Sequence, residues 1–186
     1  MTRDEMTSAL REMGDELARR EVTAKIFVVG GAVMVLAHDA REATVDGDGD
    51  AYPHDQVLAA ARDVARGRGL PEDWLHSAAH GFIPVFRSPE WRPLFHFGSL
   101  EVLAVDERTM LAMKIRASRG QRDEPDIEVL ARSCGVTSVD EALALYEEYF
   151  PEDPSPAWAL LVLRHLLAKE PNSRIVEESP TRGETP

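Results

Sequence analysis

Three aspartates alternate with two glycines in the run from Asp46 to Asp50, and this spacing indicates chemistry with a metal ion. In an extended chain every second side chain projects from the same face, so Asp46 and Asp48 would hold their carboxylates a few ångströms apart. Carboxylates that close need a cation between them, and Mg²⁺ or Mn²⁺ suits such oxygen ligands. Asp50 extends the alternation, so the pair is either Asp46 and Asp48 or Asp48 and Asp50, and Thr44 favours the first. A flexible acidic turn has the same pattern.

A glycine pair lies upstream of the aspartates. Gly30 and Gly31 stand between Lys25–Val29, a short β-branched run, and Ala32–His38, an apolar run typical of a buried helix. We therefore expect a strand, a tight turn and a helix in succession. Backbone N–H groups at such a turn can hold a phosphate, although an ordinary tight turn has the same glycines.

One segment is basic although the chain as a whole is acidic. The 186 residues include 21 basic and 33 acidic ones, and the resulting net charge of −12 disfavours a general nucleic-acid coat protein. From Arg108 to Arg122 there are five basic residues, among them Lys114 and Arg116, and no acidic residue. This segment is suited to a triphosphate or to the phosphates of an RNA end, and the alternative is a solvated helix face.

The elements that must position these residues follow from hydrophobic spacing and from turn and capping residues. Strands are predicted at Lys25–Val29, Glu42–Ala51, Leu94–Phe97 and Leu100–Val105, the last two joined by a hairpin at Gly98-Ser99. Helices are predicted at Thr2–Arg20, Ala32–His38, Asp55–Arg68, Glu107–Arg119, Asp126–Cys134, Ser138–Tyr149 and Pro156–Ala168. The segment Trp74–Pro93 has no clean period, and we expect loops and short irregular elements there.

These elements predict an α+β fold with a small mixed sheet, followed by a helical C-terminal region. We expect an N-terminal helix (1–21), a core (22–120), a helical subdomain (121–168) and a disordered tail (169–186). The single cysteine, Cys134, excludes an internal disulfide and favours a reducing compartment. No apolar run approaches the ~20 residues that span a bilayer, so a cytoplasmic protein without a membrane partner is expected.

The glycine pair, a short helix and the D-x-D motif on the next strand resemble the active-site motifs of the nucleotidyltransferase superfamily with the polymerase-β-like fold. Further motifs resemble the small bacterial nucleotidyltransferase-like proteins related to the AbiEii and MenT toxins. They are R-E-A-T-V-D-G-D (41–48), G-L-P (69–71) with W-L (74–75), G-F-I-P (81–84), L-A-M-K (111–114) and R-D-x-x-D-I (122–127). The similarity covers about Lys25 to Phe150.

The resemblance implies a polymerase-β-like core and assigns roles to individual residues. Gly30 and Gly31 would hold a nucleoside triphosphate, and Asp46 and Asp48, with Asp50 as a further candidate, would bind Mg²⁺ or Mn²⁺. Lys114 would neutralise charge on the phosphates, with Arg116 of the same basic segment also binding nucleotide, and Asp126 would orient the lysine or act as a base. The implied activity is transfer of a nucleoside monophosphate from the triphosphate to an acceptor hydroxyl.

The implied acceptor is the 3′ end of tRNA, as in a toxin of the toxin–antitoxin or phage-defence type. One alternative is transfer of AMP to a partner protein, such as a cognate antitoxin or toxin. Another is a catalytically degenerate module that binds nucleotide or protein. Two departures from the family pattern favour the degenerate form: Ala32 follows the glycines where serine is common, and Gly47 stands where a branched residue is usual.

Other residues are weaker candidates. His76 and His80 have the spacing of a zinc pair on a helix but lack a convincing third ligand, and Glu101 is a candidate for a third metal-binding acid. Four aromatic residues are candidates for stacking on a base: Trp74, Phe82, Phe86 and Trp91.

Overall fold

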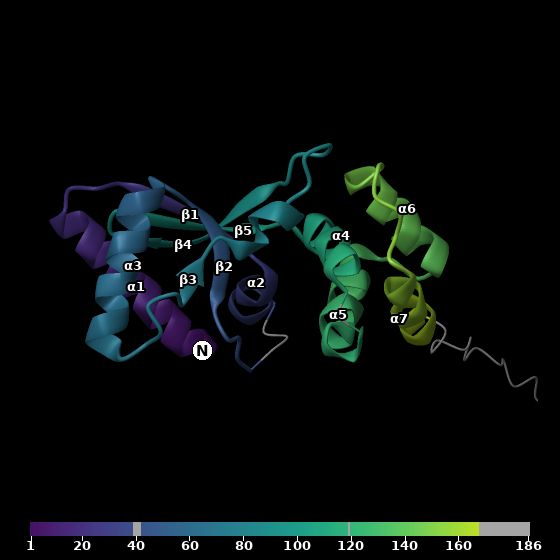
Figure 1. Cartoon of the computed structure of the whole chain (residues 1–186), viewed down its shortest axis with the longest axis horizontal. Helices are drawn as coiled ribbons and strands as arrows, with labels where there is room; N and C mark the ends of the chain where they lie inside the picture. Colours follow the sequence, from purple (N-terminus) through teal and green to yellow (C-terminus); the bar gives the residue numbers. More distant parts are fainter. Residues whose placement is uncertain (39–41, 119, 168–186) are drawn as a thin grey trace, which may run out of the picture.

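A computed structural model describes residues 1–38, 42–118 and 120–167, and it has the predicted α+β architecture with a small mixed sheet (Figure 1). The sheet order is β3-β2-β1-β5-β4, with β1 Ala24–Val29, β2 Gly47–Tyr52, β3 Leu75–His76, β4 Trp91–Phe97 and β5 Leu100–Val105. The helices are α1 Arg3–Arg19, α2 Gly30–Leu36, α3 His54–Arg68, α4 Glu107–Ala117, α5 Glu124–Cys134, α6 Val139–Tyr149 and α7 Ala157–Leu167, with short 3₁₀ helices η1 Ala78–Phe82 and η2 Gly120–Arg122. The sheet with α1 and α3 forms one end of the molecule, and α4 to α7 form the other (Figure 1).

Strand β1 is the centre of the sheet. It runs parallel to β5 and antiparallel to β2, and β3 pairs in parallel with the first two residues of β2. Strands β4 and β5 form the predicted hairpin at Gly98-Ser99. Strand β4 is the edge opposite to β3, and its register shifts between Pro93 and Phe95, because proline has no N–H to donate to the ladder.

Helix α1 packs against β4, β5 and α3. The predicted apolar stripe is buried: Met6, Leu10, Met13 and Leu17. Each such side chain contributes about 1.5–3 kcal/mol by leaving water. Close approach also depends on Gly14, since a Cβ at this position would lie 2.2 Å from the Phe97 carbonyl oxygen.

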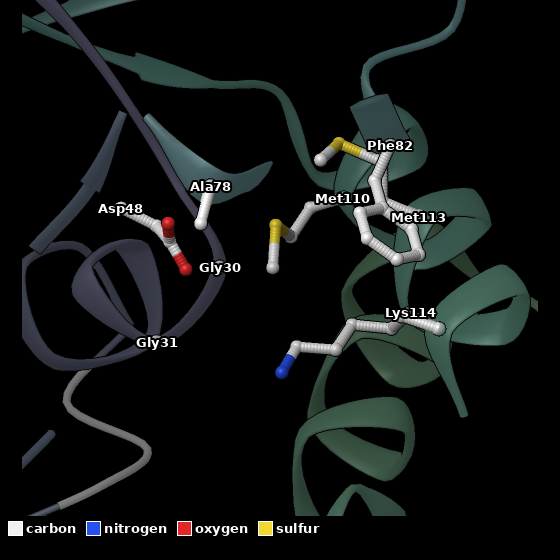
Figure 2. Close-up of a pocket in the computed structure, with 9 residues that line it drawn as sticks. Gly30, Gly31, Asp48, Ala78, Phe82, Met110, Met113 and Lys114 are labelled. Carbon is white, nitrogen blue, oxygen red and sulfur yellow. The ribbon is translucent and has the colours of Figure 1, made fainter. Parts of the chain in front are cut away.

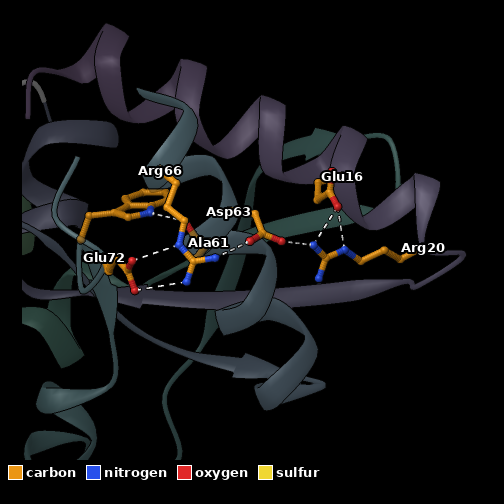
Figure 3. A network of polar contacts seen from close by, with 7 residues as sticks. Glu16, Arg20, Ala61, Asp63, Arg66 and Glu72 are labelled. Carbon is orange, nitrogen blue, oxygen red and sulfur yellow. Dashed lines mark hydrogen bonds and ion pairs between the residues drawn. The ribbon is translucent and has the colours of Figure 1, made fainter. Parts of the chain in front are cut away.

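An exposed ion network joins the ends of α1 and α3 (Figure 3). Arg20, which follows α1, contacts Glu16 at 2.7 Å and Asp63 of α3 at 2.5 Å. Asp63 also contacts Arg66 at 3.2 Å, and Arg66 reaches Glu72 at 3.0 Å. Exposed pairs contribute little singly, so the network chiefly fixes the mutual orientation of the two helices.

The structure departs from the predicted elements around the aspartates. Strand β2 begins at Gly47 rather than Glu42, so Asp46 lies in a bend before the strand. The two-residue strand β3 falls in the segment 74–93 that was expected to be irregular, and β4 begins three residues before the predicted Leu94. Two residues are too few to show a period, which is why β3 leaves no pattern in the sequence.

The C-terminal helices follow their capping signals. Ser138 caps α6 in the predicted capping box with Glu141, and Gly135 ends α5 in the left-handed conformation. Cys134 is half-buried at this helix end, where burial raises the pKa of its thiol to about 11. Across the described ranges, every helix is too short or too polar to span a bilayer. The predicted tail, 169–186, lies outside those ranges.

Candidate functional site

A cavity of about 230 Å³ lies between the sheet and α4. Gly30, Gly31 and Asp48 line it on the side of the sheet, and Lys114 lines it on the side of α4. Figure 2 shows the Asp48 carboxylate and the Lys114 ammonium pointing into the same space from opposite walls. The remaining wall is apolar and consists of Ala78, Phe82, Met110, Met113 and Ala117.

A second cavity, of about 610 Å³, adjoins the first and is more polar. Gly31, Asp48 and Lys114 line both cavities. The second adds the segment 43–46, which includes Thr44 and Asp46, and it adds Arg122 from η2. Asp48, predicted for metal, and Lys114, predicted for phosphate, therefore lie where the two cavities join.

The Asp46 and Asp48 carboxylates both contact the ring of His76. The sequence interpretation did not place this histidine with the two aspartates. His76 of β3 is the register partner of Asp48 in β2, so the two side chains are neighbours across the strands. The His76 ring has Nδ1 2.8 Å from Asp48 Oδ1 and Nε2 2.9 Å from Asp46 Oδ2. One ligand atom from each residue lies within 4.8 Å of the others, a grouping that could hold a metal ion.

The two carboxylates also act on the protonation of His76. Partial burial by itself lowers the pKa of the imidazole, but the hydrogen bond with Asp46 and the negative charges of Asp48 and Asp46 outweigh it. The net result is a His76 pKa above its ordinary value of 6.5. The protonated ring can thus balance part of the carboxylate charge.

His76 and His80, a weak candidate for a zinc pair, do not share a helix. His76 lies in β3 and His80 in η1, and the two histidines face different aspartates. Asp50 Oδ2 is 3.4 Å from His80 Nδ1, so the structure gathers Asp46 and Asp48, rather than Asp48 and Asp50, around His76. The spacing of four between the histidines does not reflect a helix, because Ser77 separates the end of a strand from the start of a 3₁₀ helix.

Glu101 does not lie at the site. Its carboxylate is 2.7 Å from the Lys25 ammonium, and Lys25 and Glu101 are register partners on β1 and β5. Asp48 is instead the register partner of Val29, at the opposite end of β1. The expectation that Glu101 supplies a third metal-binding acid is therefore wrong.

Lys114 is buried between its two acidic partners. Its Nζ is 2.6 Å from Asp126 Oδ2 and 3.3 Å from Asp123 Oδ1, and both aspartates belong to the start of α5. The lysine exposes 5% of its surface and the aspartates none. Asp126 was predicted to meet Lys114, whereas Asp123 was not singled out, although it lies nine residues after the lysine in the R-D-x-x-D motif.

The basic segment does not form one surface. Arg108 pairs with Glu148 at 3.3 Å, and Arg119 lies outside the described residues. Arg116, predicted to bind nucleotide, does not line the cavities. It donates to the Gly81 carbonyl, pairs with Asp153 at 2.7 Å and lies over the rings of Phe82 and Phe150.

Close packing surrounds Gly31, which precedes the departure at Ala32, and Gly47, the other departure from the pattern of the proteins that the chain resembles. A Cβ on Gly31 would lie 2.4 Å from Thr44 Oγ1, so this hydroxyl sits directly against the turn that precedes Ala32. A Cβ on Gly47 would lie 3.3 Å from Leu75 Cδ1 and 4.0 Å from Met6 Cε. Neighbouring side chains therefore occupy the core space that a branched residue would fill at position 47.

Of the four candidate stacking residues, Phe82 alone lines either of the two cavities. Trp74 is buried and donates its indole N–H to the Ala61 carbonyl, and Trp91 packs edge-on against Phe27.

Comparisons of the chain with protein-family models, with curated proteins and with solved structures return no match. The site itself is therefore the basis for a function. It combines a grouping that could hold a cation with a buried ammonium and an apolar wall.

Proposed function

We propose that the chain is a nucleotidyltransferase of the polymerase-β-like superfamily, dependent on Mg²⁺ or Mn²⁺. It would transfer a nucleoside monophosphate from a nucleoside triphosphate to an acceptor hydroxyl. The observation that carries this proposal is the cavity with Asp48 and the Gly30-Gly31 turn on one wall and Lys114 on the other. A cation site and a glycine turn that face a buried ammonium suit a triphosphate, which needs positive charge on both sides.

The proposed reaction is an in-line displacement at the α-phosphorus, with pyrophosphate as the leaving group, and each residue of the site would have its own role in it. Asp46 and Asp48 would hold the metal ion, which neutralises phosphate charge and acidifies the acceptor hydroxyl when bound. Lys114 places its ammonium where negative charge grows on the phosphates, and Asp126 fixes that ammonium at 2.6 Å. Lys114 is thus held in position before substrate arrives.

The apolar wall suits the nucleobase. Phe82, Met110 and Met113 offer an aromatic face and two polarisable side chains. A base in contact with these groups gains stacking energy but few hydrogen bonds to its edge. The proposal therefore includes recognition of a base mainly by its faces.

The acceptor is either the 3′ end of tRNA or a hydroxyl of a partner protein. The tRNA acceptor follows from the resemblance to toxin-like nucleotidyltransferases. A specific observation favours the protein acceptor: two of the basic residues expected to meet RNA phosphates, Arg108 and Arg116, already pair with Glu148 and Asp153. The net charge of −12 further weakens attraction to RNA.

The test is a transfer assay with each α-phosphate-labelled nucleoside triphosphate, Mg²⁺ or Mn²⁺, total tRNA and a cell extract. We expect label to enter tRNA or one protein band, and Asp48→Asn to reduce the rate by about a thousandfold or more. Asp55→Asn, an exposed carboxylate in the first turn of α3, is the matched control and should transfer normally. Binding of nucleotide without transfer under either metal would instead identify a degenerate binding module.

A further inference from the structure

We propose that His76 is the third protein ligand of the metal site and that it makes the site select Mn²⁺ over Mg²⁺. The site then comprises Asp46, Asp48 and His76, with the ring nitrogen Nε2 as the ligand atom of the histidine. The inference rests on the proposed function for the role of the ion, but the ligand set itself can be tested without any transfer reaction.

The contacts of the ring direct Nε2 toward Asp46. His76 Nδ1 lies 2.8 Å from Asp48 Oδ1, and the Ala78 N–H donates to the same nitrogen at 3.2 Å. These contacts fix the orientation of the ring and leave Nε2 facing Asp46, as partners of metal-bound histidines commonly do. Nε2 and Asp46 Oδ2 lie 2.9 Å apart, and two lone-pair atoms at this distance require a proton or a metal ion between them.

The spacing also fits coordination. Ligands at right angles around an ion with bonds of about 2.1 Å lie about 3 Å from each other, close to the separation of Nε2 and Asp46 Oδ2. One ligand atom from each of the three residues falls within 4.8 Å of the others. All three side chains are partly exposed, so an ion can enter and keep water in its remaining positions.

The backbone holds His76 in place independently of any ion. The Gly47 N–H donates to the Trp74 carbonyl at 2.6 Å, which anchors β3 beside the start of β2. Trp74 is itself buried, with its indole N–H bonded to the Ala61 carbonyl at 2.9 Å. A ligand two residues beyond such an anchor is preorganised, so little conformational entropy is lost on binding.

The choice of ion follows from the nitrogen ligand. Mg²⁺ takes oxygen ligands and gives up its waters reluctantly, whereas imidazole favours first-row transition ions. Among the first-row transition ions, Mn²⁺ is the one that also suits carboxylate, phosphate and water oxygens in octahedral coordination. A site with two carboxylates alone would discriminate less between the two ions.

The test titrates Mn²⁺ into the full chain without nucleotide and follows the free ion by electron paramagnetic resonance, with Mg²⁺ as competitor. We expect His76→Ala to weaken Mn²⁺ binding by about tenfold or more and to change Mg²⁺ binding much less. His80→Ala is the matched control, because His80 faces Asp50 and should leave both affinities unchanged. Pulsed measurements should show nitrogen coupling to Mn²⁺ in the unmodified chain and in His80→Ala.

Two results would overturn the inference. If His76→Ala binds Mn²⁺ equally well or more tightly, the imidazole competes with the metal instead of binding it. If the Mn²⁺ complex of the unmodified chain has no nitrogen coupling, His76 is not a ligand, and this result does not depend on how any variant folds. Failure of the transfer assay alongside nitrogen-coupled Mn²⁺ would reject the proposed function and leave the metal site standing.

Discussion

At the scale of single residues, Lys114 has the most unusual surroundings. Lysines in helices usually extend into water, but Lys114 exposes 5% of its surface and contacts two aspartates that expose none. Burying charge is costly unless the partners are close, so Asp123, Asp126 and the ammonium depend on one another. The contacts with the two aspartates therefore hold the Lys114 ammonium in a fixed position at the cavity.

We therefore predict that Lys114→Met lowers the free energy of unfolding by about 3–5 kcal/mol, because it removes an ammonium that contacts two buried carboxylates. Adding Asp126→Asn should recover part of this loss, since it removes one of those charges. Urea unfolding measures both effects. Lys25→Met is the matched control, because Lys25 pairs with Glu101 at an exposed position and should cost less than about 1 kcal/mol. Equal effects of the two lysine substitutions would contradict the prediction.

The sequence was informative about residues that belong to recognisable motifs. Asp46, Asp48, Lys114 and Asp126 were selected together; the first three line the second cavity, and Asp126 contacts Lys114. His76 was considered only for its spacing from His80, because a contact made through strand register depends on β3, which sequence periodicity does not show. Arg116 lies outside the two cavities, and the sequence does not show which side of α4 faces α6 and its neighbours.

At the scale of elements, the approach of α1 to the hairpin depends on one missing side chain. Gly14 is in the middle of α1, where glycine ordinarily weakens a helix. Here the Phe97 carbonyl occupies the space that a Cβ would need. The sequence pattern predicted the helix and its apolar stripe, but it did not indicate how close the helix lies to the sheet.

We predict opposite effects for two glycine-to-alanine substitutions in helices. Gly14→Ala should destabilise the fold by about 2 kcal/mol or more, since the new Cβ would lie 2.2 Å from backbone and force α1 away. Gly67→Ala, at an exposed position of α3 where the nearest atom is 3.9 Å away, should stabilise it by up to about 1 kcal/mol. Thermal unfolding of the two variants measures the difference, and a stabilised Gly14→Ala would show that α1 does not pack as described.

The predictable elements were those with local signals. The hairpin at Gly98-Ser99 and the capping box of Ser138 and Glu141 depend on neighbouring residues, and both are present. The start of β2 and the whole of β3 depend on each other through pairing between distant segments. The residues within each segment do not indicate this pairing, so the predicted start of the strand that corresponds to β2 is too early in the sequence.

At the scale of the whole molecule, the cavity lies between the sheet and the helical end (Figure 1). Asp48 and the glycine turn belong to the sheet side of the cavity, and Lys114 belongs to α4 on the helical side. Arg116 connects η1 to the chain after α6 through the Gly81 carbonyl and Asp153. Because it also lies over the Phe82 ring, it supports the apolar wall from outside the cavity.

We predict that Arg116→Met raises the KM for the nucleoside triphosphate about three- to tenfold, equivalent to the loss of about 1 kcal/mol of cation–π and ion-pair energy behind Phe82. Metal affinity should not change, because Asp46, Asp48 and His76 lie across the cavity. Hydrogen exchange should increase in η1 and around Asp153. Arg132→Met, which removes an exposed pair with Glu128, is the control. A fall in kcat without a change in KM would show that Arg116 acts on the chemical step.

The proline and the register shift in β4 bear on how copies of the chain behave at high concentration. An edge strand with regularly spaced free N–H and C=O groups is a template on which a strand of another molecule can add. Pro93 offers no N–H, and the shift that follows it breaks the regular spacing of the other groups. The edge opposite to β3 is therefore poorly suited to extending the sheet from one molecule to the next.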